Sequence, residues 1–95
     1  MKEEQLNETI MNLVEQIRLA DDLDKSQINN LYSLLNQFCD EYQHKKLVPK
    51  DAIYCLIVLR DNLEGALKHA KGDDLKNISE ISSKVDSYIE RLFLS

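Results

Sequence analysis

The 95-residue chain has no tryptophan, one proline and two glycines, so it contains few of the residues that make tight turns. A β-sandwich or β-barrel needs many such turns, and this composition argues against both architectures. Long apolar runs are also missing, because the longest one extends only from Ala52 to Leu59. A membrane-spanning helix needs about 20 apolar residues, so we interpret this run as a buried helix face.

The chain has fewer basic than acidic residues, with 12 Lys and Arg and 17 Asp and Glu, and its net charge is -5. Nucleic-acid binding relies on concentrated basic residues, so we expect no nucleic-acid partner. The first residues are polar and no signal-type apolar stretch follows them, which predicts a cytoplasmic protein. The only cysteines, Cys39 and Cys55, stand among large apolar residues. In a reducing compartment we expect both to be small buried side chains rather than a disulfide.

Apolar residues that recur every three or four positions predict two helices in the first half of the chain. The first helix spans about residues 2–20, and the acidic segment 21–24 ends it because aspartate favours caps and turns. Asp24 or Ser26 caps the second helix, which extends to about residue 42. The expected core positions are Leu6, Ile10, Leu13, Val14, Ile17, Ile28, Leu31, Leu34, Leu35, Phe38, Cys39 and Tyr42.

Two more helices are predicted in the second half of the chain. Pro49 supplies the start of the third helix, whose first half is apolar on nearly all sides and is therefore expected to be the most central helix. Its last turn contains the cations of residues 68–71, and Gly72 fits the left-handed position that ends many helices. Asp73 or Asp74 caps the fourth helix. The expected core positions are Ala52, Leu56, Leu59, Leu63, Ala66, Leu67, Ala70, Leu75, Ile78, Ile81, Val85, Tyr88, Ile89 and Leu92.

Four helices joined by short breaks favour antiparallel neighbours. A chain of this length builds one hydrophobic core rather than two. We therefore predict a single domain over residues 1–95, an all-α, antiparallel up-down four-helix bundle.

The residue types that commonly bind metals or perform catalysis do not occur at spacings that would bring them together. Cys39 and His44 are five positions apart, or about 500° around a helix, so they point to different faces. His69 stands alone, and the isolated Gly65 and Gly72 do not form a phosphate-binding loop. We expect no metal, no cofactor and no enzymatic activity.

A small basic cluster, Lys45, Lys46 and Lys50, stands at the break between the second and third helices. Such a cluster is either a solvated loop or a point of peripheral contact with an anionic lipid surface. The sequence leaves both interpretations open.

The C-terminal residues Leu92, Phe93 and Leu94 are consecutive, and they fan out over about 200° of a helix. Some apolar area at this end is therefore either exposed or packed back onto the bundle. An exposed patch would mark a contact site. It could also form the seam of a weak homodimer, so both a monomer and a weak homodimer remain open.

Four stretches of the chain share their apolar spacing with one known family. They are Leu31-x3-Leu35-x2-Phe38, Leu47-Val48-Pro49, Leu56-Ile57-Val58-Leu59, and the segment 73–85 with Leu75, Ile78, Ser79, Glu80 and Ile81. Through these stretches, residues 28–85 resemble the pediocin-type (class IIa) bacteriocin immunity proteins of lactic acid bacteria and their relatives. The resemblance implies a small cytosolic antiparallel four-helix bundle without catalytic activity.

The same resemblance implies a partner. Proteins of this family shield the producing cell from its own pore-forming peptide, acting from the cytosolic side on the mannose phosphotransferase permease with bound bacteriocin. In the family, the C-terminal half determines which bacteriocin is countered. Carried over by position, this nominates as partner-binding residues Lys68, Lys71, Gly72, Asp73, Asp74, Tyr88, Arg91, Phe93 and Leu94. The alternative hypothesis is a small helical adaptor or regulatory module that binds another protein through its helix faces.

Overall fold

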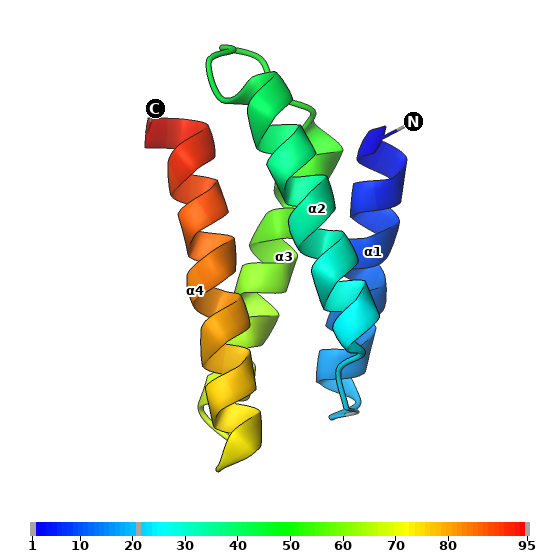
Figure 1. Ribbon diagram of the computed structural model, residues 1–95, viewed down its shortest axis with the longest axis vertical. Coiled ribbons are helices and arrows are strands. Elements are labelled where there is room, and N and C mark those ends of the chain that lie inside the picture. Colours follow the sequence, from blue (N-terminus) through cyan, green and yellow to red (C-terminus); the bar gives the residue numbers. More distant parts are fainter. Residues whose placement is uncertain (1, 21, 95) are drawn as a thin grey trace.

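The computed structural model describes residues 2–20 and 22–94, which fold into four α-helices (Figure 1). The helices are α1 (Lys2–Arg18), α2 (Lys25–Tyr42), α3 (Lys50–Leu67) and α4 (Asp73–Leu94). Within these residues there is no strand, and each helix runs antiparallel to the helix before it. The prediction of an all-α, up-down four-helix bundle is confirmed. Asp21, which belongs to the predicted break after the first helix, lies outside the described residues.

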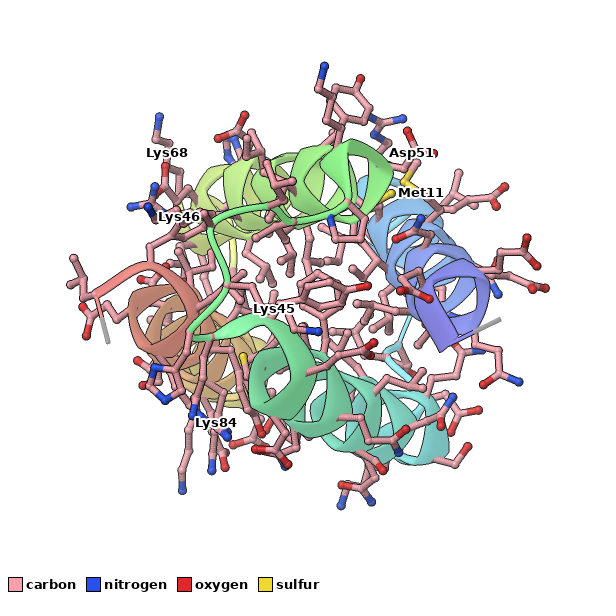
Figure 2. The ribbon with its side chains drawn as sticks, turned by 90° about the horizontal axis from the view of Figure 1, so that it is seen from above. Met11, Lys45, Lys46, Asp51, Lys68 and Lys84 are labelled. Carbon is pink, nitrogen blue, oxygen red and sulfur yellow. The ribbon has the colours of Figure 1, made fainter. Side chains whose placement is uncertain are left out.

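The order of the helices around the bundle differs from their order along the chain (Figure 2). α1 packs against α2 and α3, and α4 packs against α3 and α2, so α2 and α3 are diagonally opposite. The link of residues 43–49 therefore crosses over one end of the bundle. As a result, α1 and α3 lie side by side and point the same way, as do α2 and α4 (Figure 1).

The first break follows the sequence closely. Asp24 is the N-cap of α2, and its Oδ1 accepts hydrogen bonds from Ser26 N at 2.9 Å and Ser26 Oγ at 2.8 Å. These bonds stabilise the carboxylate and lower the pKa of Asp24. α1 ends at Arg18 rather than near residue 20, because Ala20 adopts the left-handed conformation with φ 56° and cannot continue a right-handed helix.

The second half of the chain needs one correction. α3 ends at Leu67, so Lys68 and His69 lie in the turn beyond it rather than in its last helical turn. Gly72 has the expected left-handed conformation, with φ 60°, but it stands directly before α4. Its carbonyl accepts the N–H of Lys76 at 3.2 Å, so Gly72 opens α4 instead of closing α3. Asp73 and Asp74, which were predicted to cap this helix, lie inside its first turn.

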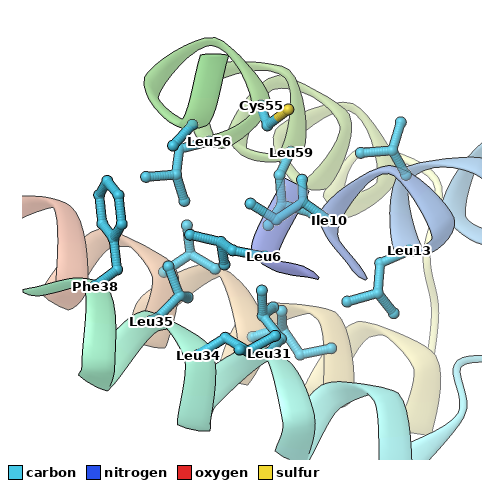
Figure 3. Packing of buried hydrophobic residues seen from close by; sticks show 14 of the residues in the cluster. Leu6, Ile10, Leu13, Leu31, Leu34, Leu35, Phe38, Cys55, Leu56 and Leu59 are labelled. Atoms are coloured by element: carbon cyan, nitrogen blue, oxygen red, sulfur yellow. The ribbon is translucent and has the colours of Figure 1, made fainter. Parts of the chain in front are cut away.

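All four helices contribute to one hydrophobic core. Figure 3 shows Leu6 and Ile10 of α1 between Leu35 of α2 and Leu59 of α3. Apart from Cys55, all fully or nearly fully buried side chains belong to predicted core positions: Leu6, Ile10, Leu13, Val14, Leu31, Leu34, Leu35, Phe38, Cys39, Ala52, Leu56, Leu59, Leu63, Ile81, Val85 and Leu92. The prediction is wrong for Leu75, which is 40% exposed near the start of α4.

The prediction that α3 is the most central helix is wrong. Two large side chains in its apolar first half face solvent, Tyr54 with 66% and Ile57 with 53% of its surface exposed. α3 occupies a corner of the bundle like the other helices, because its neighbours α1 and α4 cover only two of its sides. Its outward apolar residues are therefore surface residues rather than core.

Candidate functional site

The nominated residues lie at opposite ends of the bundle. The end that holds the link 43–49 and the last turn of α4 is here called the tail end. The end that holds residues 19–20, 22–24 and 68–72 is called the cavity end (Figure 1). Lys68, Lys71, Gly72, Asp73 and Asp74 belong to the cavity end. Tyr88, Arg91, Phe93 and Leu94 belong to the last two turns of α4. Asp74 and Tyr88, the nearest members of the two groups, are 14 residues or about 20 Å apart along α4, so the groups form two surfaces and not one.

At the tail end, three consecutive apolar residues separate into core and surface. Leu92 is buried, whereas Phe93 is 57% exposed and Leu94 is 81% exposed. This confirms that part of the apolar area of the last turn is exposed. The buried Leu92 anchors this turn to the core, so the two exposed side chains are held at fixed positions.

The other two nominated residues of α4 face α2 instead of solvent. The ring of Tyr88 is half-buried and lies 6.3 Å from the ring of Tyr32. Arg91 Nε donates a hydrogen bond to Gln43 Oε1 at 2.8 Å, and its guanidinium also pairs with Asp40. Tyr88 and Arg91 therefore hold the end of α4 against α2.

α3 has a further exposed apolar residue between the Arg60–Asp86 contact and the tail end. Arg60 Nε lies 3.2 Å from Asp86 Oδ1, which fixes the register of these two antiparallel helices. Ile57 lies one turn beyond this contact on α3, and Phe93 lies two turns beyond it on α4, in the same direction. Ile57, Phe93 and Leu94 are each more than half exposed. We call these three residues the tail patch.

The basic cluster beside the tail patch is partly turned onto the protein. The ammonium of Lys45 lies 5.1 Å from the centre of the Tyr42 ring and covers the end of the core (Figure 2). Lys46 and Lys50 are exposed, and Leu47 between them is 85% exposed. A solvated loop and a contact with anionic lipid both remain predictions for this segment.

The two cysteines are free and buried, as predicted. Cys39 Sγ donates a hydrogen bond to the backbone carbonyl of Tyr88 at 3.4 Å. Burial raises the pKa of both thiols, which keeps them in the less reactive protonated form at neutral pH. Among residues 2–20 and 22–94, no three or more His, Cys, Asp and Glu side chains converge as metal ligands.

At the cavity end, the helices enclose a half-open cavity of about 1030 Å³. Its apolar lining comes from all four helices and the first link, and includes Ile17, Leu23, Ile28, Ile78 and Ile81. Most of these side chains are only half-buried, because one side of each borders the cavity. Of the nominated partner-binding residues, Asp74 alone is among the described residues that line this cavity.

The cavity follows from a change of side-chain size along α3. Towards the tail end, Leu59 and Leu63 fill the space between the helices and are fully buried. Towards the cavity end, the lining residues after Asn62 are Gly65 and Ala66, and Ala70 follows in the turn. Gly65 is exposed and lies about 200° around α3 from the buried Leu63, so the small side chains that face the interior here are those of Ala66 and Ala70. They do not fill the space opposite α2 and α4.

Sequence reasoning missed the cavity because the apolar residues around it have the spacing of core residues. Ile28 and Ile78 were expected in the core, and the spacing does not reveal whether another side chain fills the opposite side. The signal in the sequence is the occurrence of the small residues Ala66 and Ala70 at the end of the third helix, where large apolar side chains would be needed to fill the core.

Comparisons with protein-family models, with curated proteins and with solved structures found no match to this chain. In the described part of the chain, no helix is sufficiently long and apolar to cross a membrane.

Proposed function

We propose that this protein is a non-enzymatic immunity protein of the kind that its sequence resembles. It acts from the cytosolic side on a mannose phosphotransferase permease that carries a bound pore-forming peptide. The proposal combines the sequence resemblance with one structural observation, which is the exposure of Phe93 and Leu94 beside the buried Leu92.

The tail patch has the properties of a contact surface. Phe93 and Leu94 are fixed to a rigid element, because Arg91 in the same part of α4 pairs with Asp40 of α2 and bonds to Gln43 directly after α2. Two exposed charged residues lie near it along the helices: Glu90, one turn before Phe93 and Leu94 on α4, and Lys50, two turns before Ile57 on α3. Apolar anchors inside a polar rim are typical of protein interfaces, where the anchors supply most of the binding energy.

In this proposal, the nominated residues have different tasks. Phe93 and Leu94 contact the partner, while Tyr88 and Arg91 position them. The exposed turn around Lys68, Lys71, Gly72, Asp73 and Asp74 lies at the far end of the bundle and serves a second contact.

Protection of a sensitive strain tests the function directly. The protein is expressed in a strain that class IIa peptides kill, and survival is measured against a panel of these peptides. We expect the peptide concentration needed for killing to rise for one peptide type. If no peptide of the panel is countered while the folded protein accumulates, the proposal is wrong.

The second candidate function is a small helical adaptor, and the cavity at the opposite end favours it. An adaptor holds a segment of another protein and needs a preformed recess with an apolar lining, which the cavity end provides. In this case no peptide of the panel would be countered, and binding to the cavity would be the measurable activity.

A further inference from the structure

The cavity interrupts a row of core side chains along α3. Leu56, Leu59 and Leu63 are buried at successive turns of this row. Ala66 continues the row at helical spacing, and Ala70 follows it, since its N–H still donates to the carbonyl of Ala66 at 2.9 Å. Two alanines therefore stand where the row would need large side chains, and the space that they leave is part of the cavity.

The side chains opposite these alanines are apolar. The cavity is lined by four isoleucines from three helices and by a leucine of the first link: Ile17, Ile28, Ile78, Ile81 and Leu23. All of them except Ile81 are only half-buried, so apolar surface of the core stays in contact with solvent. Covering such surface with an apolar ligand is favourable, because it removes the surface from water.

The polar side chains that reach the cavity offer no partner for a buried charge. Asn62 is engaged within the protein, since its Nδ2 donates to the carbonyl of Val58 at 2.8 Å and its Oδ1 accepts from Arg18 Nε at 3.2 Å. The Asp, Glu, Lys and Arg residues of the lining are exposed, and no charged side chain is buried among the residues that the structure describes. A charged group placed inside the cavity would lose its hydration without gaining a partner, which disfavours an ionic ligand.

The dimensions of the cavity are those of a small-molecule site. Such sites have volumes of about 300–1,000 Å³, and in helical proteins they occur between the helices of bundles. The cavity has a volume of about 1030 Å³, and because it is half-open, part of this volume belongs to its mouth. All four helices contribute to its lining, so an occupant would be contacted from several sides.

We propose that the cavity binds an uncharged, predominantly apolar small molecule, which packs against the isoleucines and against Ala66 and Ala70. The cavity and the tail patch lie at opposite ends of the bundle (Figure 1). The proposal therefore goes beyond the immunity function, and either of the two can fail without the other.

Two fluorescent probes with the same aromatic body test the proposal on the purified protein. N-phenyl-1-naphthylamine is uncharged, and 1-anilinonaphthalene-8-sulfonate is the same molecule with one added sulfonate group. The fluorescence of both probes rises in an apolar environment, and the protein has no tryptophan that would add to the signal. We expect the uncharged probe to bind saturably with one molecule per protein, and the sulfonate to bind at least about tenfold more weakly.

Variants that fill the cavity locate the bound probe. Ala66→Leu restores a large side chain to the row and should weaken binding of the uncharged probe at least about tenfold, without loss of helix content. Ala70→Leu fills the cavity from the turn after α3 with the same expected loss, and it decides the question if Ala66→Leu does not fold. The matched control is Ser87→Leu, which adds the same side chain to an exposed position of α4 outside the described lining and should leave binding unchanged.

The double variant Phe93→Ala with Leu94→Ala distinguishes the cavity from the tail patch, and it should bind the uncharged probe like the unmodified protein. Four results would overturn the proposal. The first is no saturable binding of the uncharged probe, and the second is equal affinity for the two probes. The third is binding that the cavity-filling variants leave intact, and the fourth is loss of binding in the double variant, which would place the probe on the tail patch.

Discussion

The hydroxyl group of Tyr42 donates a hydrogen bond of 2.6 Å to Oε1 of Glu3, and it joins the end of α2 to the start of α1. This bond needs the protonated phenol. Together with partial burial and the negative charge of Glu3, it raises the pKa of Tyr42 to about 12.

The raised pKa predicts a loss of stability at alkaline pH. The ordinary pKa of the phenol is 10.0, so between pH 10 and about 12 the folded protein retains a proton that the unfolded chain releases. The free energy of unfolding should therefore fall as pH rises through this window, whereas the contribution of Tyr42 is fully present below it. Chemical denaturation at pH 8 to 11.5 measures the fall.

The variant Tyr42→Phe separates this group from the others that titrate nearby. Burial also raises the pKa of Tyr32, Cys39 and Cys55, but these groups are present in both proteins. We expect the variant to be less stable at pH 8 and to lose less stability between pH 10 and 12. Equal slopes for the two proteins would show that Tyr42 titrates normally.

The two glycines should respond oppositely to alanine. Gly65 has helical geometry and free space around it, so Gly65→Ala should stabilise the protein by about 0.5–1 kcal/mol. Gly72 has a φ of 60°, which strains any other residue, so Gly72→Ala should destabilise it by about 1 kcal/mol. Thermal unfolding of both variants checks the signs, and a change of the same sign in both would contradict the backbone assignments.

Arg91 should contribute more to stability than the more exposed Arg60. Arg91 bonds to Gln43 and pairs with Asp40, whereas Arg60 pairs with Glu64 and Asp86 on a side chain that is 52% exposed.

Solvent screens exposed ion pairs, so Arg60→Ala should cost at most about 0.5 kcal/mol and Arg91→Ala about 1 kcal/mol. Urea denaturation of the two variants gives the comparison. If Arg91→Ala costs no more than Arg60→Ala, Arg91 does not hold α4 against α2.

Much of the fold could be predicted from the sequence because apolar spacing and helix caps act locally. The spacing of Leu6 and Ile10, or of Leu31 and Leu35, identifies residues that are fully buried in the bundle. Asp24 caps α2 through a bond to a residue only two positions away, so it could be found in the sequence.

The remainder depends on how helices meet, which local patterns do not describe. Ile57 belongs to an apolar run, yet it is exposed because no helix covers that side of α3. The sequence indicates Arg91 as a surface residue available to a partner, but in the structure it contacts Asp40 and Gln43, which lie about 50 positions earlier at the end of α2 and directly after it. The cavity depends on Ala66 and the distant Ile28 and Ile78 lining the same space, which is a property of the packing alone.

The most direct measurement of the central claim is protection by the double variant Phe93→Ala with Leu94→Ala. Its matched control is Leu19→Ala, which removes an apolar side chain that is 64% exposed at the opposite end of the protein. We predict that the double variant loses protection against the countered peptide while its helix content and melting temperature stay nearly unchanged, and that the control protects fully. Full protection by the double variant, or a loss of protection that accompanies unfolding, would contradict the assignment of the tail patch as the contact surface.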